Sequence, residues 1–411
     1  MTARCLFAMP CLMMLALMYP SAAHSSPATP DNVQADKPHS HTHSPGEIDE
    51  EQAPFIIDVT YTADLWRAAS GGLKQGTRYL DNLDIVAEAD MERLVGWKGA
   101  LIHVYGLYNN GKSLNVLMGD AQVASNIETG VKAVRLYEAW IDQKIGDRVS
   151  VRAGLYDLNS EFDALDASGL FMGSAHGIGP DISQSGENGP SIFPSTSLAA
   201  RIAVSPAQGW IVRAAILDGV PGNPARPGHT AIKLGNGDGA LLIGEVEAPL
   251  PKGKLLFGHW RYTQKISDLT GMAKRGNDGF YVRGEAKLTS ESDHPDQGVS
   301  GFFRLGLADG RINQFNRIAS VGLNYTGPFA GRNNDQFGLA IATAATSQSY
   351  RQSVLSTRSE TAIELTYRAP LTNWLTVQPN IQYVINPGTN PAVRNALAFG
   401  LRTELTLRLP Q

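Results

Sequence analysis

The sequence contains little cysteine, no long apolar run beyond its first twenty residues and no excess of charge of one sign. Of its 411 residues, two are cysteines, Cys5 and Cys11. Both lie in the N-terminal segment interpreted below as a signal peptide, so we expect a mature chain without disulfides or thiol chemistry. A helical membrane protein is excluded, because a spanning helix needs about 20 consecutive apolar residues. A formal net charge of −4 argues against a nucleic-acid partner, which requires many more Lys and Arg.

The N-terminus has the features of a secretory signal peptide. Arg4 supplies a positive charge, residues 6–18 form an apolar core, and Ser21-Ala22-Ala23 resemble a cleavage site. We therefore predict an exported protein from which residues 1–23 are removed.

Residues 24–54 are rich in Pro, Ser, His, Asp and Glu, and this composition predicts a disordered tether. His39, His41 and His43 alternate within it and could form a weak site for a divalent metal. A solvated tether is the favoured interpretation, and no metal, nucleotide or redox cofactor is expected. The chain has no P-loop and no dinucleotide-binding glycine pattern.

From residue 56 onward the chain consists of short runs that alternate between polar and apolar residues. The last run places Leu401, Leu405 and Leu407 at odd positions, and Arg402 and Glu404 at even positions. Successive side chains of a strand point to opposite faces. Each run therefore predicts a strand with one face apolar enough for lipid and another that carries full charges.

Sixteen such strands are predicted. They lie at 56–65, 79–90, 98–108, 133–145, 148–157, 195–204, 210–218, 239–248, 253–262, 279–289, 299–309, 316–325, 335–344, 360–368, 374–384 and 396–408. Every second gap is short, while the gaps at 109–132, 158–194, 219–238 and 345–359 are long; 310–315 and 326–334 depart from this pattern.

An even strand number, with short turns alternating with long loops, is typical of outer-membrane barrels. We predict that residues 55–411 form an all-β, 16-stranded antiparallel transmembrane barrel with short periplasmic turns and long extracellular loops. A barrel of this size encloses an aqueous channel. The alternative is a soluble periplasmic β-rich sugar-binding protein, in which the apolar faces would form a core.

If the apolar faces point outward, charges of both signs point into the lumen. The inward set comprises Arg152, Arg201, Arg213, Arg283, Arg304, Arg402, Glu245, Glu247, Glu285, Glu360, Glu364 and Glu404. A ring of one sign would select ions, whereas mixed donors and acceptors suit neutral, hydroxyl-rich solutes. Alternatively, individual Arg/Glu pairs only brace neighbouring strands.

Two segments do not fit simple alternation. Neither face of the strand at 133–145 is apolar, which indicates either a bulge or an inserted loop that covers both faces. The loop at 158–194 is the longest, and loops of this length within a compact fold are usually functional. We expect it to fold into the lumen as a constriction loop; the alternative is an outward-facing lid.

Several segments, taken in order along residues 60–408, resemble the carbohydrate-selective porins of the OprB type. The resemblance is strongest at Arg135-Leu136-Tyr137-Glu138-Ala139-Trp140 and in the segment from Arg152 to Phe162, and it continues through Gly301-Phe302-Phe303-Arg304 and residues 377–388. It implies passive, facilitated diffusion of monosaccharides and related polyols through a barrel narrowed by a loop. It also implies constriction roles for Glu138, Trp140, Arg152, Glu161, Phe162 and Asp163.

Other conclusions follow from the same resemblance. The partners implied are small neutral sugars or polyols, outer-membrane lipid and the barrel-assembly machinery, although the chain ends in Arg408-Leu409-Pro410-Gln411 instead of the usual aromatic residue. A single barrel is favoured as the oligomeric state. A general diffusion porin is the alternative function. A barrel hydrolase that uses His103 or His259 is disfavoured, so no enzyme activity is expected.

Overall fold

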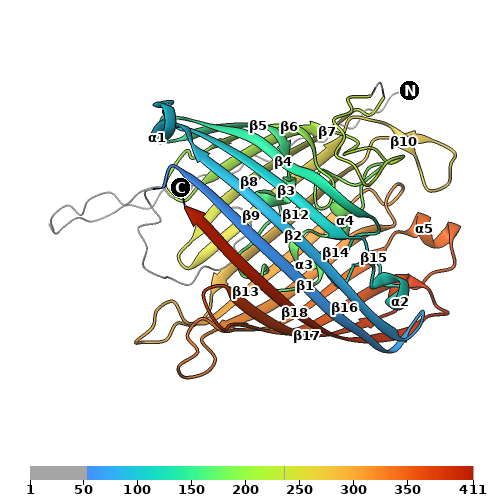
Figure 1. The fold of residues 1–411 in the computed structure, drawn as a ribbon. Helices are drawn as coiled ribbons and strands as arrows, with labels where there is room; N and C mark the ends of the chain where they lie inside the picture. The colour runs from blue at the N-terminus through green and yellow to red at the C-terminus, as the bar shows by residue number, and fades with distance from the viewer. Residues whose placement is uncertain (1–52, 236, 411) are drawn as a thin grey trace, which may run out of the picture. The chain divides into compact units, whose positions relative to one another are not determined.

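The computed structural model describes residues 53–235 and 237–410, and these form a closed β-barrel (Figure 1). Its strands are β1 (Phe55–Gly72), β2 (Gly76–Asp90), β3 (Ala100–Asn110), β4 (Lys132–Ile145), β5 (Val149–Tyr156), β6 (Ser197–Val204), β7 (Ile211–Asp218), β8 (Ala240–Leu250), β9 (Gly253–Tyr262), β12 (Asp278–Lys287), β13 (Gly298–Ala308), β14 (Phe315–Thr326), β15 (Gln336–Thr346), β16 (Ser359–Pro370), β17 (Leu375–Ile385) and β18 (Arg394–Pro410). The predicted signal peptide and the three tether histidines lie outside the described residues.

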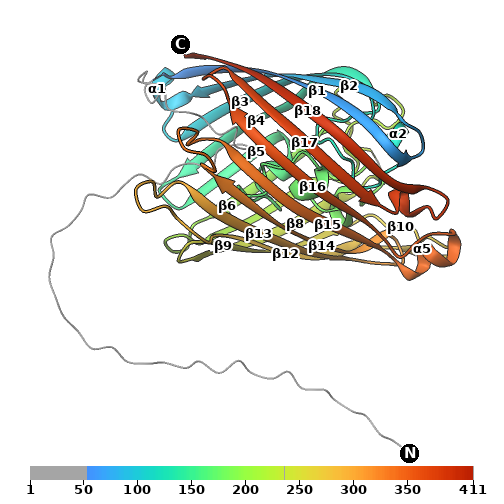
Figure 2. The same ribbon diagram turned by 90° about the horizontal axis from the view of Figure 1, so that it is seen from below.

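Each strand of the barrel pairs antiparallel with its neighbours in the chain, and β1 pairs with β18 to close the sheet. Closure leaves no sheet edge with unpaired backbone groups. The predicted sixteen-stranded antiparallel barrel is thus confirmed. Figure 2 shows the same wall from a second direction, with β18 beside both β1 and β17. Among the described residues, no helix is long and apolar enough to cross a membrane.

The alternation in sequence separates two faces of the wall. Leu65 and Leu401 point outward and are 51% and 43% exposed, whereas Asp64 and Arg402 point inward and are 0% and 6% exposed. This orientation is the opposite of the soluble alternative, in which apolar faces would fill the core.

Aromatic side chains mark the end of the barrel that carries the short turns. Trp97, Trp210, Trp374 and Phe329 are exposed, and all four lie in or beside connections at this end. Aromatic girdles of this kind lie at the membrane–water interface of outer-membrane barrels. The remaining connections, including the longest ones, leave the opposite end.

One strand boundary was predicted wrongly, and a small hairpin was missed. The first strand continues to Gly72, not 65, and turns at once into β2. The turn is supported from outside the hairpin, because Leu73 and Lys74 both donate backbone hydrogen bonds to the Leu117 carbonyl (2.8 and 3.0 Å). A small hairpin of β10 (Ile266–Ser267) and β11 (Lys274–Arg275) in the loop after β9 was not predicted.

The irregular fourth strand, β4, contains a bulge, which was one of the two explanations offered for its lack of an apolar face. Tyr105 on β3 pairs with Glu138, but its neighbour Gly106 pairs with Leu136, so Tyr137 is the extra residue. Both Tyr137 and Glu138 are therefore buried inside the barrel. The bulge changes the parity of the strand and turns Trp140 inward.

Two connections fold into the barrel. The loop between β5 and β6 contains η2 (Leu158–Ser160), α3 (Ser174–Gly177) and α4 (Pro180–Ser183), and its backbone is hydrogen-bonded to β8, β12 and β16. This loop therefore contacts inward-facing side chains of the wall, and its role as a constriction stays a prediction. The loop between β3 and β4, with α2 (Asn115–Met118), also enters and contacts β16 and β17, which the sequence did not predict.

Gly154 tests the packing around this bulged strand. It has φ +144° and pairs with Trp140, and an added Cβ would lie 2.2 Å from the Ala139 carbonyl oxygen. We expect Gly154→Ala to destabilise the folded barrel by about 2 kcal/mol, measured by urea unfolding followed by gel mobility. Gly130→Ala is the matched control, because its Cβ would meet nothing within 4 Å. Equal midpoints for the two variants would contradict this packing.

Candidate functional site: the loop-narrowed lumen

A buried ion-pair network anchors the constriction loop to the wall. The Asp163 carboxylate of the loop accepts bonds from Arg304 Nη2 at 2.7 Å and from Arg283 Nη1 at 3.0 Å. Arg304 also bonds Asp181 of α4 (3.2 Å). All four side chains are 0% exposed. Removing one partner from such a network is costly, because an uncompensated buried charge remains.

Wall glutamates accept backbone N–H groups of the inserted loops. Glu364 accepts the N–H groups of Met172 and Gly173 at 2.7 and 2.9 Å, and Glu245 accepts that of Asp163 at 2.9 Å. Glu285 accepts the Ala167 N–H at 2.7 Å. Backbone donors withdrawn from water need such partners, and charged acceptors make the stronger bonds.

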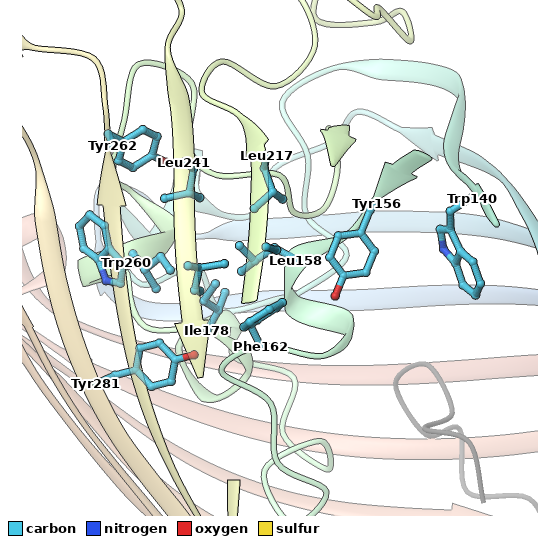
Figure 3. Close-up of a cluster of buried hydrophobic side chains, with 13 residues drawn as sticks. Trp140, Tyr156, Leu158, Phe162, Ile178, Leu217, Leu241, Trp260, Tyr262 and Tyr281 are labelled. Atoms are coloured by element: carbon cyan, nitrogen blue, oxygen red, sulfur yellow. The ribbon is translucent and has the colours of Figure 1, made fainter. Parts of the chain in front are cut away.

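An apolar cluster covers the base of the constriction loop. Leu158 and Phe162, both 0% exposed, pack with Leu217, Leu241 and Trp260 of the wall (Figure 3). The wall residues of this cluster and the arginines that pair with Asp163 lie on neighbouring strands. Apolar burial and charge pairing therefore hold the same part of the loop, residues 158–163.

Four charged groups of alternating sign link β4, β5, β6 and the loop. Arg201 bonds Glu161 at 2.7 Å and Asp142 at 2.8 Å, and Arg152 bonds the same Asp142 at 3.0 Å. Arg152 Nη2 lies 3.6 Å from Glu161 Oε1. Two guanidinium groups thus share two carboxylates, and the net charge of the group is close to zero.

Trp140 lies between two other inward side chains. The His103 ring on β3 stacks on the indole at 4.4 Å between centroids, and the Arg152 guanidinium on β5 lies 3.7 Å from the ring centroid. The indole Nε1 donates to Glu138 (3.0 Å). Trp140 is therefore a packed support of the wall and orients Arg152 through a cation–π contact.

The predicted site residues all lie inside the barrel, but they fall into two groups by accessibility. Nine are at most 4% exposed: Glu138, Phe162, Asp163, Arg201, Arg213, Glu245, Arg283, Arg304 and Glu364. The others are slightly more exposed, at 6–11%: Trp140, Arg152, Glu161, Glu285, Arg402 and Glu404. The first group holds the loop and wall together. Contact with a solute stays a prediction, and it is physically open to the second group.

The contacts that hold the loop between β3 and β4 were not predicted, although Arg402 and Glu360 were predicted to face inward. Asp64 accepts bonds from Ser125 Oγ (2.7 Å) and Arg402 (2.7 and 2.9 Å), and Arg402 also donates to Asn126 at 2.8 Å. Glu360 accepts the N–H groups of residues 121 and 122 at 2.8 and 2.9 Å. The inward parity of Asp64 and the length of the 109–132 gap were visible in the sequence, but neither feature specifies that the loop enters the lumen.

Two titratable loop groups have displaced pKa values. Burial, reinforced by the Arg283 charge, lowers the pKa of His176 to about 3, so this imidazole is neutral near pH 7. Burial, together with Glu360 and Glu128, raises the pKa of Asp120 to about 7. In each inserted loop, burial thus disfavours the charged form of a titratable side chain.

A closed barrel of sixteen antiparallel strands, apolar outside and polar inside, with loops folded into its lumen, defines a porin of the outer-membrane type. Residues 74–407 match the family described as carbohydrate-selective porin, OprB family. The chain belongs to this family, and it is an outer-membrane carbohydrate porin of Gram-negative bacteria.

The chain is also similar to individual porins in sequence and in structure. Porin B of Pseudomonas aeruginosa is 28% identical over 381 residues, which cover 80% of this chain and 81% of that protein. The putative porin QuiX of Acinetobacter baylyi is 22% identical over 396 residues, covering 84% and 88%. The high-pH structure of Pseudomonas putida OprB superposes with a TM-score of 0.76 at 21% identity, covering 86% of this chain and 94% of that chain.

Asp163→Asn tests the loop anchor. Asn tolerates the φ of +53° at this position but removes the charge that Arg283 and Arg304 share. We expect a loss of about 3 kcal/mol in the stability of the anchored loop, measured as faster proteolysis of the loop in outer-membrane vesicles. Asp166→Asn is the control, because the Asp166 side chain is 81% exposed. Equal cleavage rates for the two variants would contradict the anchor.

Asp120→Asn tests the second loop through its pH dependence. A pKa raised from an unfolded value of about 3.9 means that the favourable contribution of Asp120 is present below about pH 4. It is lost as the pH rises through about 7. We therefore expect the variant to protect residues 115–125 from hydrogen exchange more than the parent does at pH 8, with little difference at pH 4. A difference that does not change with pH would be contrary evidence.

Proposed function

We propose that small neutral sugars and related polyols cross this barrel by passive, facilitated diffusion through the lumen left between the inserted loops and the wall. The observation that carries this proposal is the pairing of inward-facing charges along the wall. Arg152 is paired with Asp142, Arg368 with Glu404 and Arg408 with Asp58, at 2.7 to 3.1 Å. Each pair presents a donor and an acceptor with little net charge.

Paired charges suit hydroxyl groups better than ions. A guanidinium offers N–H donors and a carboxylate offers acceptors, so a sugar hydroxyl can bond to both. A passing ion gains from one member of the pair and is repelled by the other, in contrast to a ring of a single sign. The lumen therefore favours neutral polar solutes without binding them tightly.

We assign solute contact to the more accessible residues, Arg152, Glu161, Arg402, Glu404, Glu285 and the edge of Trp140. The residues that are at most 4% exposed position the loops. One barrel is the proposed transport unit, because each barrel encloses a complete constriction of its own.

Family membership implies a channel and not an enzyme, and the two candidate histidines fit this proposal. His103 is 1% exposed, bonded to Glu88 at 3.0 Å and stacked on Trp140. His259 lies on the exterior face, 4.3 Å from the Phe280 ring. Both histidine side chains therefore pack against neighbouring residues of the barrel wall.

Liposome swelling tests the proposal. We expect glucose to enter faster than a zwitterionic amino acid of similar size. Arg152→Gln removes one charge-assisted donor, and we expect glucose entry to slow by up to about tenfold and cation selectivity to rise in salt-gradient potentials. Arg317→Gln, at an exposed outward position on β14, serves as the control. Equal swelling by sugar and zwitterion would support a general diffusion porin and contradict selectivity.

A further inference from the structure

The paired first and last strands form an irregular seam at the end of the barrel opposite the aromatic turns. The β1–β18 ladder is irregular there, with register shifts between Ala68 and Ser70 and between Ser70 and Gly72. A cavity of about 450 Å³ lies beside these shifts and is lined by Ser70, Gly71, Arg394 and Asn395. It is separate from the loop anchors and the paired charges described above.

Gly71 and Asn395 pack closely against each other at the wall of this cavity. Gly71 has φ +64°, and a Cβ there would lie 1.7 Å from the Asn395 carbonyl oxygen. The Asn395 side chain is held at both ends, because its Nδ2 donates to Tyr383 Oη at 3.1 Å and its Oδ1 accepts the Asn386 N–H at 3.0 Å. The backbone is thus fixed around the cavity.

The two chain segments that flank the cavity carry cations and no carboxylates of their own. Residues 65–80 and 386–401 contain Arg67, Lys74, Arg78 and Arg394 but no Asp or Glu. Arg67 is exposed on the exterior face, where it lies 3.4 Å from the Thr77 hydroxyl, and Arg394 is exposed at the cavity itself. This local excess contrasts with the paired charges of the lumen.

The cavity also lies where the apolar exterior ends. Leu65, Phe399 and Leu401, on the same two strands, are outward-facing and 43–51% exposed. Arg67 follows Leu65 on the same face and pairs with Phe399 across the seam. Cations placed just beyond an apolar membrane belt are at the depth of lipid headgroups.

From this arrangement we propose that the Arg394 cavity binds the phosphate group of a glycolipid in the outer leaflet, with Arg67 as a second cation. Guanidinium groups bind phosphate oxygens in a forked geometry, and the Ser70 hydroxyl supplies a further donor. The acyl chains of the lipid would lie against Leu65 and Leu401. A free inorganic phosphate shares the headgroup chemistry but gains nothing from this apolar surface.

Native mass spectrometry of the full mature barrel in a phosphate-free detergent tests the proposal. The probes are diphosphorylated lipid A, the same lipid with its phosphates removed, and inorganic pyrophosphate alone. We expect retention of the phosphorylated lipid to exceed that of the dephosphorylated lipid by about tenfold. The double variant Arg67→Gln/Arg394→Gln should lose about the same factor.

Arg317→Gln is the matched control, since it removes an exposed outward cation at the same end of the barrel, on β14. Unchanged heat-modifiable gel mobility and glucose swelling would show that the double variant is folded. Equal retention of the two lipids, or an equal loss in the control, would overturn the proposal. Displacement of the lipid by equimolar pyrophosphate would assign the cavity to a free anion and overturn the lipid assignment.

Discussion

The structure depends on one constraint: a polar loop that enters a barrel must find partners there for its charges and its backbone. The Asp163 carboxylate meets this need by pairing with Arg283 and Arg304, whose side chains have no exposed surface. Glu245 and Glu364 accept nearby backbone N–H groups of the same loop. Because unpaired buried charges are so costly, these contacts select the inserted position over an outward one.

This constraint divides the inward charges between two tasks. Those covered by the loop maintain its position, whereas those at its margins, such as Arg152 and Glu161, keep some accessible surface. Both sets are paired, so the lumen is lined by charges without acquiring a strong field of either sign. A narrow passage with this lining is suited to neutral solutes with many hydroxyl groups.

Period-two alternation was sufficient to predict the sixteen strands and, outside the bulged strand, the face of the inward residues, including both Asp163 partners. It could not predict which inward residues a loop would cover, because parity specifies a face and not a contact. The entry of the loop between β3 and β4 was missed for the same reason, since its bonds to Asp64 and Glu360 join residues far apart in sequence. The bulge at Tyr137 was left as one of two alternatives, because a bulge and a covering loop both explain a strand in which neither face is apolar.

The most direct test of the inserted loop is zero-length carbodiimide cross-linking in intact outer membranes, read by mass spectrometry of the peptides. Lys254 Nζ on β9 lies 3.6 Å from the Asp166 carboxylate of the loop and 3.5 Å from Glu285 of the wall. The account predicts cross-linked peptides that join Lys254 to Asp166 as well as to Glu285. Cross-linking of Lys254 to Glu285 alone, with Asp166 only singly modified, would place the loop outside the lumen and contradict the account.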